Sequence, residues 1–181
     1  ILDIGGGDGA FASWVRDQRG YSEFTVLDIS PIAAKKAHSK GFAAQAVDIT
    51  KLPLPFPENS FPTVTLIEVL EHLYDPIGML KECQRIASDS IIFSVPNFNY
   101  LKFRLQVIRG TTPTVSLPKQ RHVWWFNSRQ LSYVLHQAGI VNFTVHPITP
   151  GRLGLGKVFR LMGKIWPSMF AADFVVKCNL R

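Results

Sequence analysis

The chain begins with an apolar stretch that runs directly into a glycine-rich turn, Ile1-Leu2-Asp3-Ile4-Gly5-Gly6-Gly7-Asp8-Gly9. A helical pattern of apolar residues follows at once. Glycine tolerates positive φ and carries no Cβ, so such a turn can bring its backbone against a ligand. The unpaired N–H groups at the start of the following helix favour a negative or strongly polar group. This order of strand, turn and helix predicts a cradle for a nucleotide-type cofactor.

Strand-like and helix-like segments alternate over the first half of the chain. Strand patterns are found at 1–4, 24–29, 42–47, 61–67 and 90–95. Helix patterns are found at 10–18, at 31–39 and from Asp75-Pro76 onward, with Asp75 as a suitable N-cap. Residues 50–60 are proline-rich and read as a loop. The alternation predicts an α/β fold with a doubly wound, mostly parallel sheet and right-handed crossovers.

The second half of the chain has a different order of helix and strand patterns. Helix patterns are found at 100–109, 128–137 and 156–166, and strand patterns at 140–148 and 172–178. We expect one domain over residues 1–181, with insertions at about 97–125 and 149–171. Because the chain opens inside a predicted strand, we also expect a segment to precede it, such as a helix that covers the site.

Composition limits the class of protein. With 46% apolar residues the chain fits a globular protein. No apolar run approaches the roughly 18 residues that a membrane span needs. Cys83 and Cys178 are too few and too far apart for a disulfide framework or a metal site. We therefore expect a cytoplasmic protein without a metal ion.

Charge is distributed unevenly. Residues 1–97 hold 8 Lys or Arg and 12 Asp or Glu, whereas residues 98–181 hold 12 Lys or Arg and a single acid, Asp173. The acidic half carries the cofactor signals, so the basic half is expected to meet a second, anionic substrate or surface; a merely solvated basic face is the alternative. The basic residues are spread out, and nucleic acid is not expected as a partner.

Acidic residues lie at or near the carboxyl ends of four successive predicted strands. They are Asp3, Asp28, Asp48 and Glu68. In open α/β sheets ligands bind at the carboxyl ends of the strands. A dinucleotide site, which the turn also fits as Gly5-x-Gly7-x-x-Ala10, needs only Asp28 among these acids. S-adenosylmethionine offers a sulfonium, an ammonium, ribose hydroxyls and an adenine amine, which several carboxylates can accept.

Taken together, Asp3-x-Gly5-x-Gly7-x-Gly9, Asp28, Asp48 and Glu68-Val69-Leu70-Glu71-His72 resemble class I S-adenosylmethionine-dependent methyltransferases. The resemblance spans residues 1 to about 97. It implies a Rossmann-like methyltransferase fold with a seven-stranded sheet and an antiparallel last strand. It also implies that Gly5, Gly6 and Gly7 line the methionine moiety and that Asp3 organises its ammonium group.

The same resemblance implies the remaining cofactor contacts. Asp28 would bind the ribose hydroxyls, with Ile29 packing on adenine. Asp48 would face the adenine amine, with Ile49 beside it, unless Asp48 only caps a turn. Glu68 would close the site below the sulfonium. Glu71 reads as a solvated charge at the start of a helix.

Methyl transfer to oxygen or nitrogen also needs a base for the acceptor's proton. Three side chains are candidates: His72 after the fourth strand, Asn97 after the fifth, and His122 in the first insertion. Each has a structural alternative: a hydrogen bond at a helix start for His72, an ordinary turn for Asn97, and a loop anchor for His122. No Cys or His spacing supports zinc.

A second set of motifs resembles a subgroup that includes MetW-type proteins and, in part, ubiquinone-type O-methyltransferases. It consists of Val95-Pro96-Asn97-Phe98, Arg104-Leu105, Arg109-Gly110, His122, Phe126 and Ala138-Gly139-Ile140. The acceptor is therefore expected to be a small molecule or a lipid-linked one. Two basic amphipathic stretches, 100–109 and 152–166, are compatible with peripheral contact to anionic lipid or with ordinary packing on the domain. Two other functions stay open: a MetW-like regulatory partner without methyl transfer of its own, and an NAD-dependent oxidoreductase.

Overall fold

The computed structural model describes residues 1–113, 122–150 and 156–180. Seven strands form one sheet in the order β3-β2-β1-β4-β5-β7-β6. Their bounds are β1 Leu2–Ile4, β2 Thr25–Asp28, β3 Ala43–Ala46, β4 Phe61–Ile67, β5 Ala87–Pro96, β6 Phe143–Ile148 and β7 Asp173–Asn179. The pairs from β3 through β5 are parallel, whereas β7 is antiparallel to both of its neighbours, β5 and β6. The predicted doubly wound sheet with an antiparallel last strand is confirmed.

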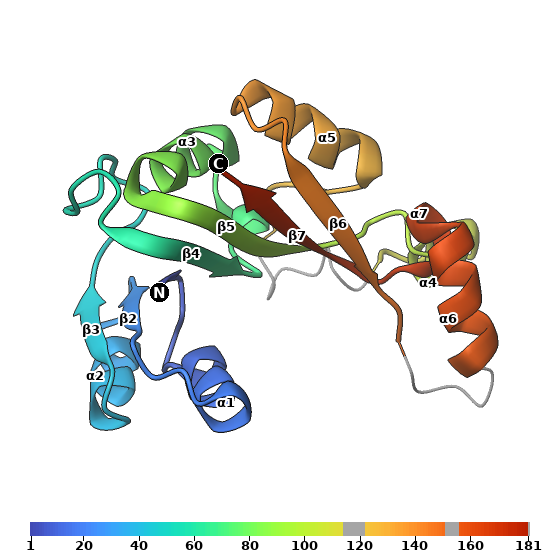
Figure 1. Ribbon diagram of the computed structural model, residues 1–181. Coiled ribbons are helices and arrows are strands. Elements are labelled where there is room, and N and C mark those ends of the chain that lie inside the picture. Colours follow the sequence, from blue (N-terminus) through green and yellow to red (C-terminus); the bar gives the residue numbers. More distant parts are fainter. Residues whose placement is uncertain (114–121, 151–155, 181) are drawn as a thin grey trace.

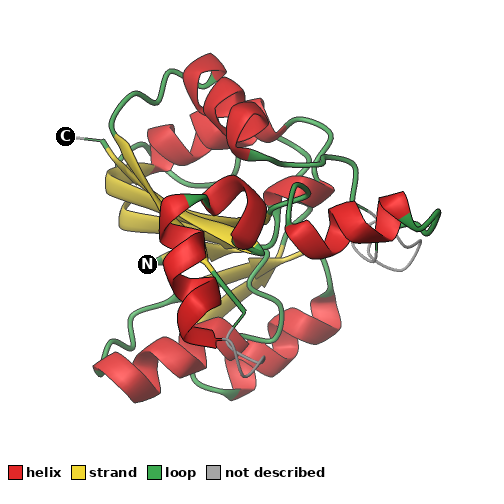
Figure 2. Ribbon diagram, turned by 90° about the vertical axis from the view of Figure 1, so that its right-hand side faces the viewer, coloured by secondary structure: helices red, strands yellow, loops and turns green. Residues whose placement is uncertain are grey.

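Helices cover both faces of the sheet (Figure 1). Their bounds are α1 Ala10–Arg19, α2 Pro31–Ser39, α3 Pro76–Ile86, α4 Leu101–Ile108, α5 Ser128–Gln137, α6 Gly156–Ile165 and α7 Pro167–Phe170, with a 3-10 turn, η1, at Leu70–His72. α1 and α2 lie on one face, and α3 and α5 on the other. α4, α6 and α7 lie beyond the carboxyl edge of the parallel strands. The view from that side, in Figure 2, looks onto these helices.

Local sequence signals explain where several helices begin. The Ser30 side chain accepts a hydrogen bond from Ala33 N–H ahead of Pro31, and Asp75 accepts one from Gly78 N–H at 2.8 Å ahead of Pro76. A capping side chain followed by proline at the first helical position satisfies free N–H groups and presets φ. The predicted N-cap at Asp75 is confirmed. These caps fix the ends of the turns that lead from the carboxyl edge into α2 and α3.

The two faces bury separate apolar cores. The larger core packs α3 and α5 against β4, β5 and β7 and includes Phe93, Phe126 and Phe174. The smaller core, under α1 and α2, is centred on Phe24, which meets Phe42 edge to face. Because both faces of the parallel strands are covered, the carboxyl edge is where the sheet can present polar groups.

Candidate functional site at the carboxyl edge of the sheet

A cavity of about 270 Å³ opens at the carboxyl edge of the sheet. Its walls come from the turn after β1, the end of β2, the segment after β3 and the segment after β4. The lining residues are Gly5, Asp28, Ile29, Ile49, Thr50, Glu68, Val69, His72 and Leu73. Six of these residues were predicted as site residues from the sequence. Residues that are up to 68 positions apart in the chain therefore meet at one place.

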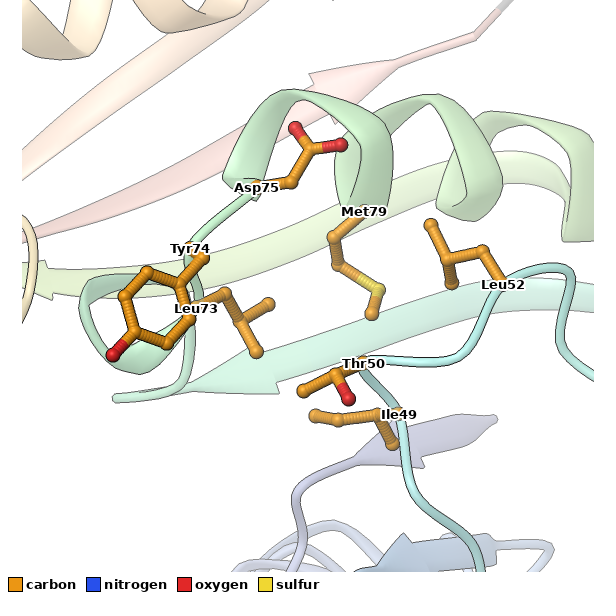
Figure 3. Close-up of a pocket in the computed structure, with 7 residues that line it drawn as sticks. All are labelled: Ile49, Thr50, Leu52, Leu73, Tyr74, Asp75 and Met79. Atoms are coloured by element: carbon orange, nitrogen blue, oxygen red, sulfur yellow. The ribbon is translucent and has the colours of Figure 1, made fainter.

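A second hollow of about 240 Å³ adjoins this cavity, because both are lined by Ile49, Thr50 and Leu73. Figure 3 shows Leu73 and Met79 on the side of the hollow that faces Ile49 and Thr50. Both hollows are lined mainly by apolar side chains, and each also has carboxylates: Asp28 and Glu68 in the first, Asp75 in the second. A ligand with a flat apolar ring and polar substituents fits such a lining.

The glycine turn is tied to the end of β2. Gly6 N–H donates to the carbonyl oxygen of Leu27 at 3.0 Å, and Gly7 N–H donates to Asp28 Oδ2 at 2.9 Å. Asp28 Oδ1 accepts from Ser30 N–H at 2.8 Å. Both oxygens of Asp28 are thus held in place by backbone donors, and their remaining lone pairs can accept from a ligand's hydroxyl groups.

Asp3 lies behind the turn rather than in the cavity wall. Its side chain is buried, with Oδ1 accepting from Thr65 Oγ1 at 2.7 Å and Oδ2 without a hydrogen-bond partner among the described residues. Burial raises the pKa of Asp3 to about 6. A Cβ at Gly6 would collide with the free oxygen of Asp3 and approach Val26 Cγ1 to 2.9 Å, so the close packing of turn on strand requires glycine there.

Asp48 caps a turn, which is the structural alternative that the sequence left open. Its Oδ1 accepts from both the backbone N–H and the hydroxyl of Thr50, and its Oδ2 lies 3.6 Å from Lys51 Nζ. These bonds lower the pKa of Asp48. Asp48 therefore caps the turn that presents Ile49 to the cavity, and contact with an adenine amine remains a prediction.

Glu68 has an unusual backbone at the end of β4. Its φ is 55°, a left-handed conformation that non-glycine residues seldom adopt. Ser94 holds it on both sides: Glu68 N–H donates to Ser94 Oγ at 3.0 Å, and Ser94 Oγ donates to Glu68 Oε1 at 2.6 Å. Such conformations persist where the surroundings enforce them, often at functional sites. Here the conformation directs the chain from β4 into η1.

His72 and His122 meet over this edge. Their rings are 4.7 Å apart between centroids, in an edge-to-face arrangement. Two backbone bonds bring them together, because Val123 N–H and Trp124 N–H both donate to the carbonyl oxygen of Glu71. Burial, and then the charge of the neighbouring His72, lower the pKa of His122. Two of the three predicted base candidates thus lie side by side, with His72 in the cavity wall.

Asn97 forms structural hydrogen bonds away from the cavity. Its side chain is fully buried, and its amide donates to the carbonyl oxygens of Ala171 at 2.8 Å and Ser168 at 3.1 Å. It joins the end of β5 to α7. The geometry gives Asn97 a structural role, and nothing directs its amide at the cavity.

Glu71 is the residue that sequence reasoning misjudged. It was expected to be a solvated charge, yet its side chain is 0% exposed. Neither carboxyl oxygen has a hydrogen-bond partner among the described residues, and Oε1 lies 3.9 Å from His72 Nε2. Burial, and then the charge of Glu68, raise the pKa of Glu71 to about 8. The backbone N–H groups of Val123 and Trp124 bind the carbonyl oxygen of Glu71, a contact between distant segments that no local pattern in the sequence reveals.

Glu71, His72 and His122 also have the chemistry to hold a metal ion. One ligand atom from each lies within 4.8 Å of the other two. From motif spacing, the sequence predicted that no metal ion is bound, and this remains a prediction. Metal binding by these three side chains would test it.

Comparison with known proteins agrees with this geometry. Residues 1–145 match the sequence model of a methyltransferase domain family. The chain belongs to this methyltransferase family. The resemblance predicted from the glycine turn and the acidic residues is therefore confirmed.

Curated relatives of this methyltransferase domain carry the name ubiquinone biosynthesis O-methyltransferase. The protein from Acinetobacter baumannii is 23% identical over 149 residues, which cover 77% of this chain and 62% of the relative. The protein from Alkalilimnicola ehrlichii is 30% identical over 132 residues, which cover 68% and 52%. The chain thus spans about six-tenths of the length of the Acinetobacter relative.

Solved methyltransferase structures share the fold. An S-adenosylmethionine-dependent methyltransferase from Thermotoga maritima superposes with a TM-score of 0.72 at 16% identity, covering 99% of this chain and 81% of that one. Magnesium protoporphyrin IX methyltransferase from Synechocystis, solved with bound S-adenosylhomocysteine (SAH), gives 0.62 at 15% identity, covering 98% and 72%. At this identity the likeness concerns the fold.

Proposed function

We propose that this chain is an S-adenosylmethionine-dependent methyltransferase that acts on a small-molecule or lipid-linked acceptor. The observation that carries the proposal is the single cavity in which Gly5, Asp28, Ile49, Glu68 and His72 meet. Asp28 is placed for ribose hydroxyl groups, and the apolar walls at Ile49 and Leu73 suit an adenine. When bound, the cofactor supplies an activated methyl group on a sulfonium.

The chain's own residues would align the acceptor and hold its proton. His72 lines the cavity and His122 lies against it, so either imidazole is placed to take a proton from an acceptor's hydroxyl group. The names of the curated relatives favour oxygen as the acceptor atom. Enclosing the acceptor and the methyl group together supplies the proximity on which such a displacement depends.

The surface at the carboxyl edge supports a lipid-like acceptor. In α4 the side chains of Leu105, Val107 and Ile108 are exposed beside basic residues, and Leu161 and Ile165 are exposed in α6. We propose that this apolar and basic surface touches anionic lipid. No helix in the described part of the chain is long and apolar enough to span a bilayer.

The exposed apolar surface also fits the second candidate, a MetW-like regulatory partner. The two functions differ in one assay. The protein is incubated with methyl-labelled S-adenosylmethionine and a soluble dihydroxybenzoate or a membrane extract, and label in the acceptor fraction is counted. Label that depends on His72 or His122 supports the enzyme; tight cofactor binding without label in either acceptor supports the regulatory protein.

A further inference from the structure

One serine hydroxyl bonds Glu68 at two points. Ser94 is buried in β5, in register with Ile67, the last residue of β4. Its Oγ accepts a hydrogen bond from Glu68 N–H at 3.0 Å and donates one to Glu68 Oε1 at 2.6 Å. A hydroxyl group can do both at once, because it has one proton and two lone pairs. The two bonds therefore close a ring between the backbone and the carboxylate of Glu68, here called the Ser94 clasp.

The clasp holds Glu68 in a conformation that its backbone does not favour. The φ of 55° places Glu68 in the left-handed region, where a Cβ crowds the backbone. Such a conformation persists only when the surroundings enforce it. Removal of the Ser94 hydroxyl would release both bonds together, and relaxation of the backbone would then redirect the carboxylate.

The segment held by the clasp forms one wall of the cofactor cavity. Glu68, Val69 and His72 all line that cavity. Val69 packs so closely on the glycine turn that a Cβ at Gly5 would lie 2.6 Å from its Cγ2 atom. The direction of the chain at Glu68 thus determines how the next turn meets Gly5. Ser94 is not among the described residues that line the cavity, so its effect on a ligand passes through this wall.

We propose that Ser94 is a positioning residue for the cofactor: its hydroxyl keeps the carboxylate of Glu68 in the cavity wall. This inference rests on the proposed function, which places S-adenosylmethionine in that cavity. The Ser94 hydroxyl occupies one lone pair of the carboxylate, and the other lone pairs can accept from N–H or O–H groups of the ligand. An acceptor that is already held in place loses little conformational freedom on binding, whereas a mobile glutamate must first be ordered.

Ser90 provides a matched control within the same strand. It lies four residues before Ser94 in β5, on the same face of the sheet, and it too is buried. Its Oγ lies 3.1 Å from Thr63 Oγ1 of β4, within hydrogen-bond distance. Each serine thus bonds from β5 to β4 or to the residue that follows β4, but of the two only Ser94 bonds a residue of the cavity wall. A role in stability alone would give the two serines similar effects.

The first test is calorimetric titration with SAH, with urea denaturation as the measure of stability. Ser94→Ala should weaken SAH binding about tenfold, the typical effect of losing one hydrogen bond to a charged group. Ser90→Ala should lower the free energy of unfolding but keep the SAH affinity close to that of wild type. Ser94→Thr keeps the hydroxyl and should recover the affinity that Ser94→Ala loses.

A double-mutant cycle tests whether Ser94 acts through Glu68. Glu68→Gly removes the carboxylate, and glycine adopts a positive φ without a clasp. In the Glu68→Gly background Ser94→Ala has no carboxylate to release, so it should leave the SAH affinity almost unchanged. Residues that act together show such non-additive effects, whereas the effects of independent residues add. A further loss of about tenfold in that background would show that Ser94 acts independently of Glu68, which overturns the proposal.

The outcomes separate this inference from the proposed function. If Ser94→Ala binds SAH as wild type does, or if Ser90→Ala or Ser94→Thr loses as much affinity as Ser94→Ala, the positioning role is refuted and the proposed function stands. If wild-type protein does not bind SAH, both are refuted. Circular dichroism checks that each variant folds. Ser94→Cys, which is similar in size but a weak donor, replaces Ser94→Ala if that variant does not fold, and if Glu68→Gly binds too weakly to titrate, the comparison of Ser94 with Ser90 decides.

Discussion

Replacing Asp28 by alanine tests the link between fold and cofactor binding in one variant. The change removes two hydrogen bonds to a carboxylate, from Gly7 N–H at 2.9 Å and from Ser30 N–H at 2.8 Å. A bond to a charged group contributes roughly 1.5–3 kcal/mol when buried, and less at a half-exposed site such as this, so we expect a loss of about 2 kcal/mol in the free energy of unfolding.

The same carboxylate would accept the two ribose hydroxyl groups of the cofactor. We therefore expect the affinity for SAH to fall about 30-fold, the equivalent of roughly 2 kcal/mol. Urea denaturation and calorimetric titration measure the two effects separately. Asp28→Asn keeps the shape and one acceptor oxygen and should lie between wild type and alanine in both. Asp17→Ala, at an exposed acid of α1, is the control. An Asp28→Ala protein that binds SAH within threefold of wild type refutes this reasoning.

Three further outcomes are expected. The pKa of Asp3 is raised to about 6, so its protonated form stabilises the fold at low pH and this contribution is lost as pH rises through about 6. Asp3→Asn should therefore raise the free energy of unfolding by about 3 kcal/mol at pH 8, by about half as much at pH 5 and hardly at all at pH 3, measured by urea titration. Asn97→Ala should destabilise the protein by about 3 kcal/mol, because buried carbonyl groups lose their donors, yet leave the SAH affinity unchanged; a loss of affinity without destabilisation contradicts its structural role. Ile108→Ser should weaken sedimentation with phosphatidylglycerol vesicles at low salt but not with neutral vesicles, and no wild-type binding to either vesicle refutes the lipid contact.

Local sequence patterns predicted the parts of the fold that depend on neighbours in the chain. The strand at Phe61–Ile67 and the helices at Pro31–Ser39 and Ser128–Gln137 were predicted with the bounds that the structure has. Alternating apolar residues, proline at the first helical position and capping side chains are local signals. The short helix Pro167–Phe170 was missed within a longer expected insertion, since four residues carry little periodicity.

The candidate site was only partly predictable, for a physical reason. Asp28 and Glu68 end strands, and strand ends of a parallel sheet meet at one edge, so topology places them. The surroundings of Glu71 come instead from a distant segment: Val123 and Trp124, about 50 positions away, bind its carbonyl oxygen. Residues 114–121 of the first expected insertion and residues 151–155, where the second basic stretch begins, lie outside the described residues.

The central claim is that the polar edge of this sheet holds an adenosyl sulfonium cofactor rather than a dinucleotide. Calorimetric titration of wild-type protein with SAH and, separately, with NAD tests it directly. The account predicts that SAH binds at least about a hundredfold more tightly than NAD, a difference of roughly 2.7 kcal/mol. Equal or tighter binding of NAD would contradict the account.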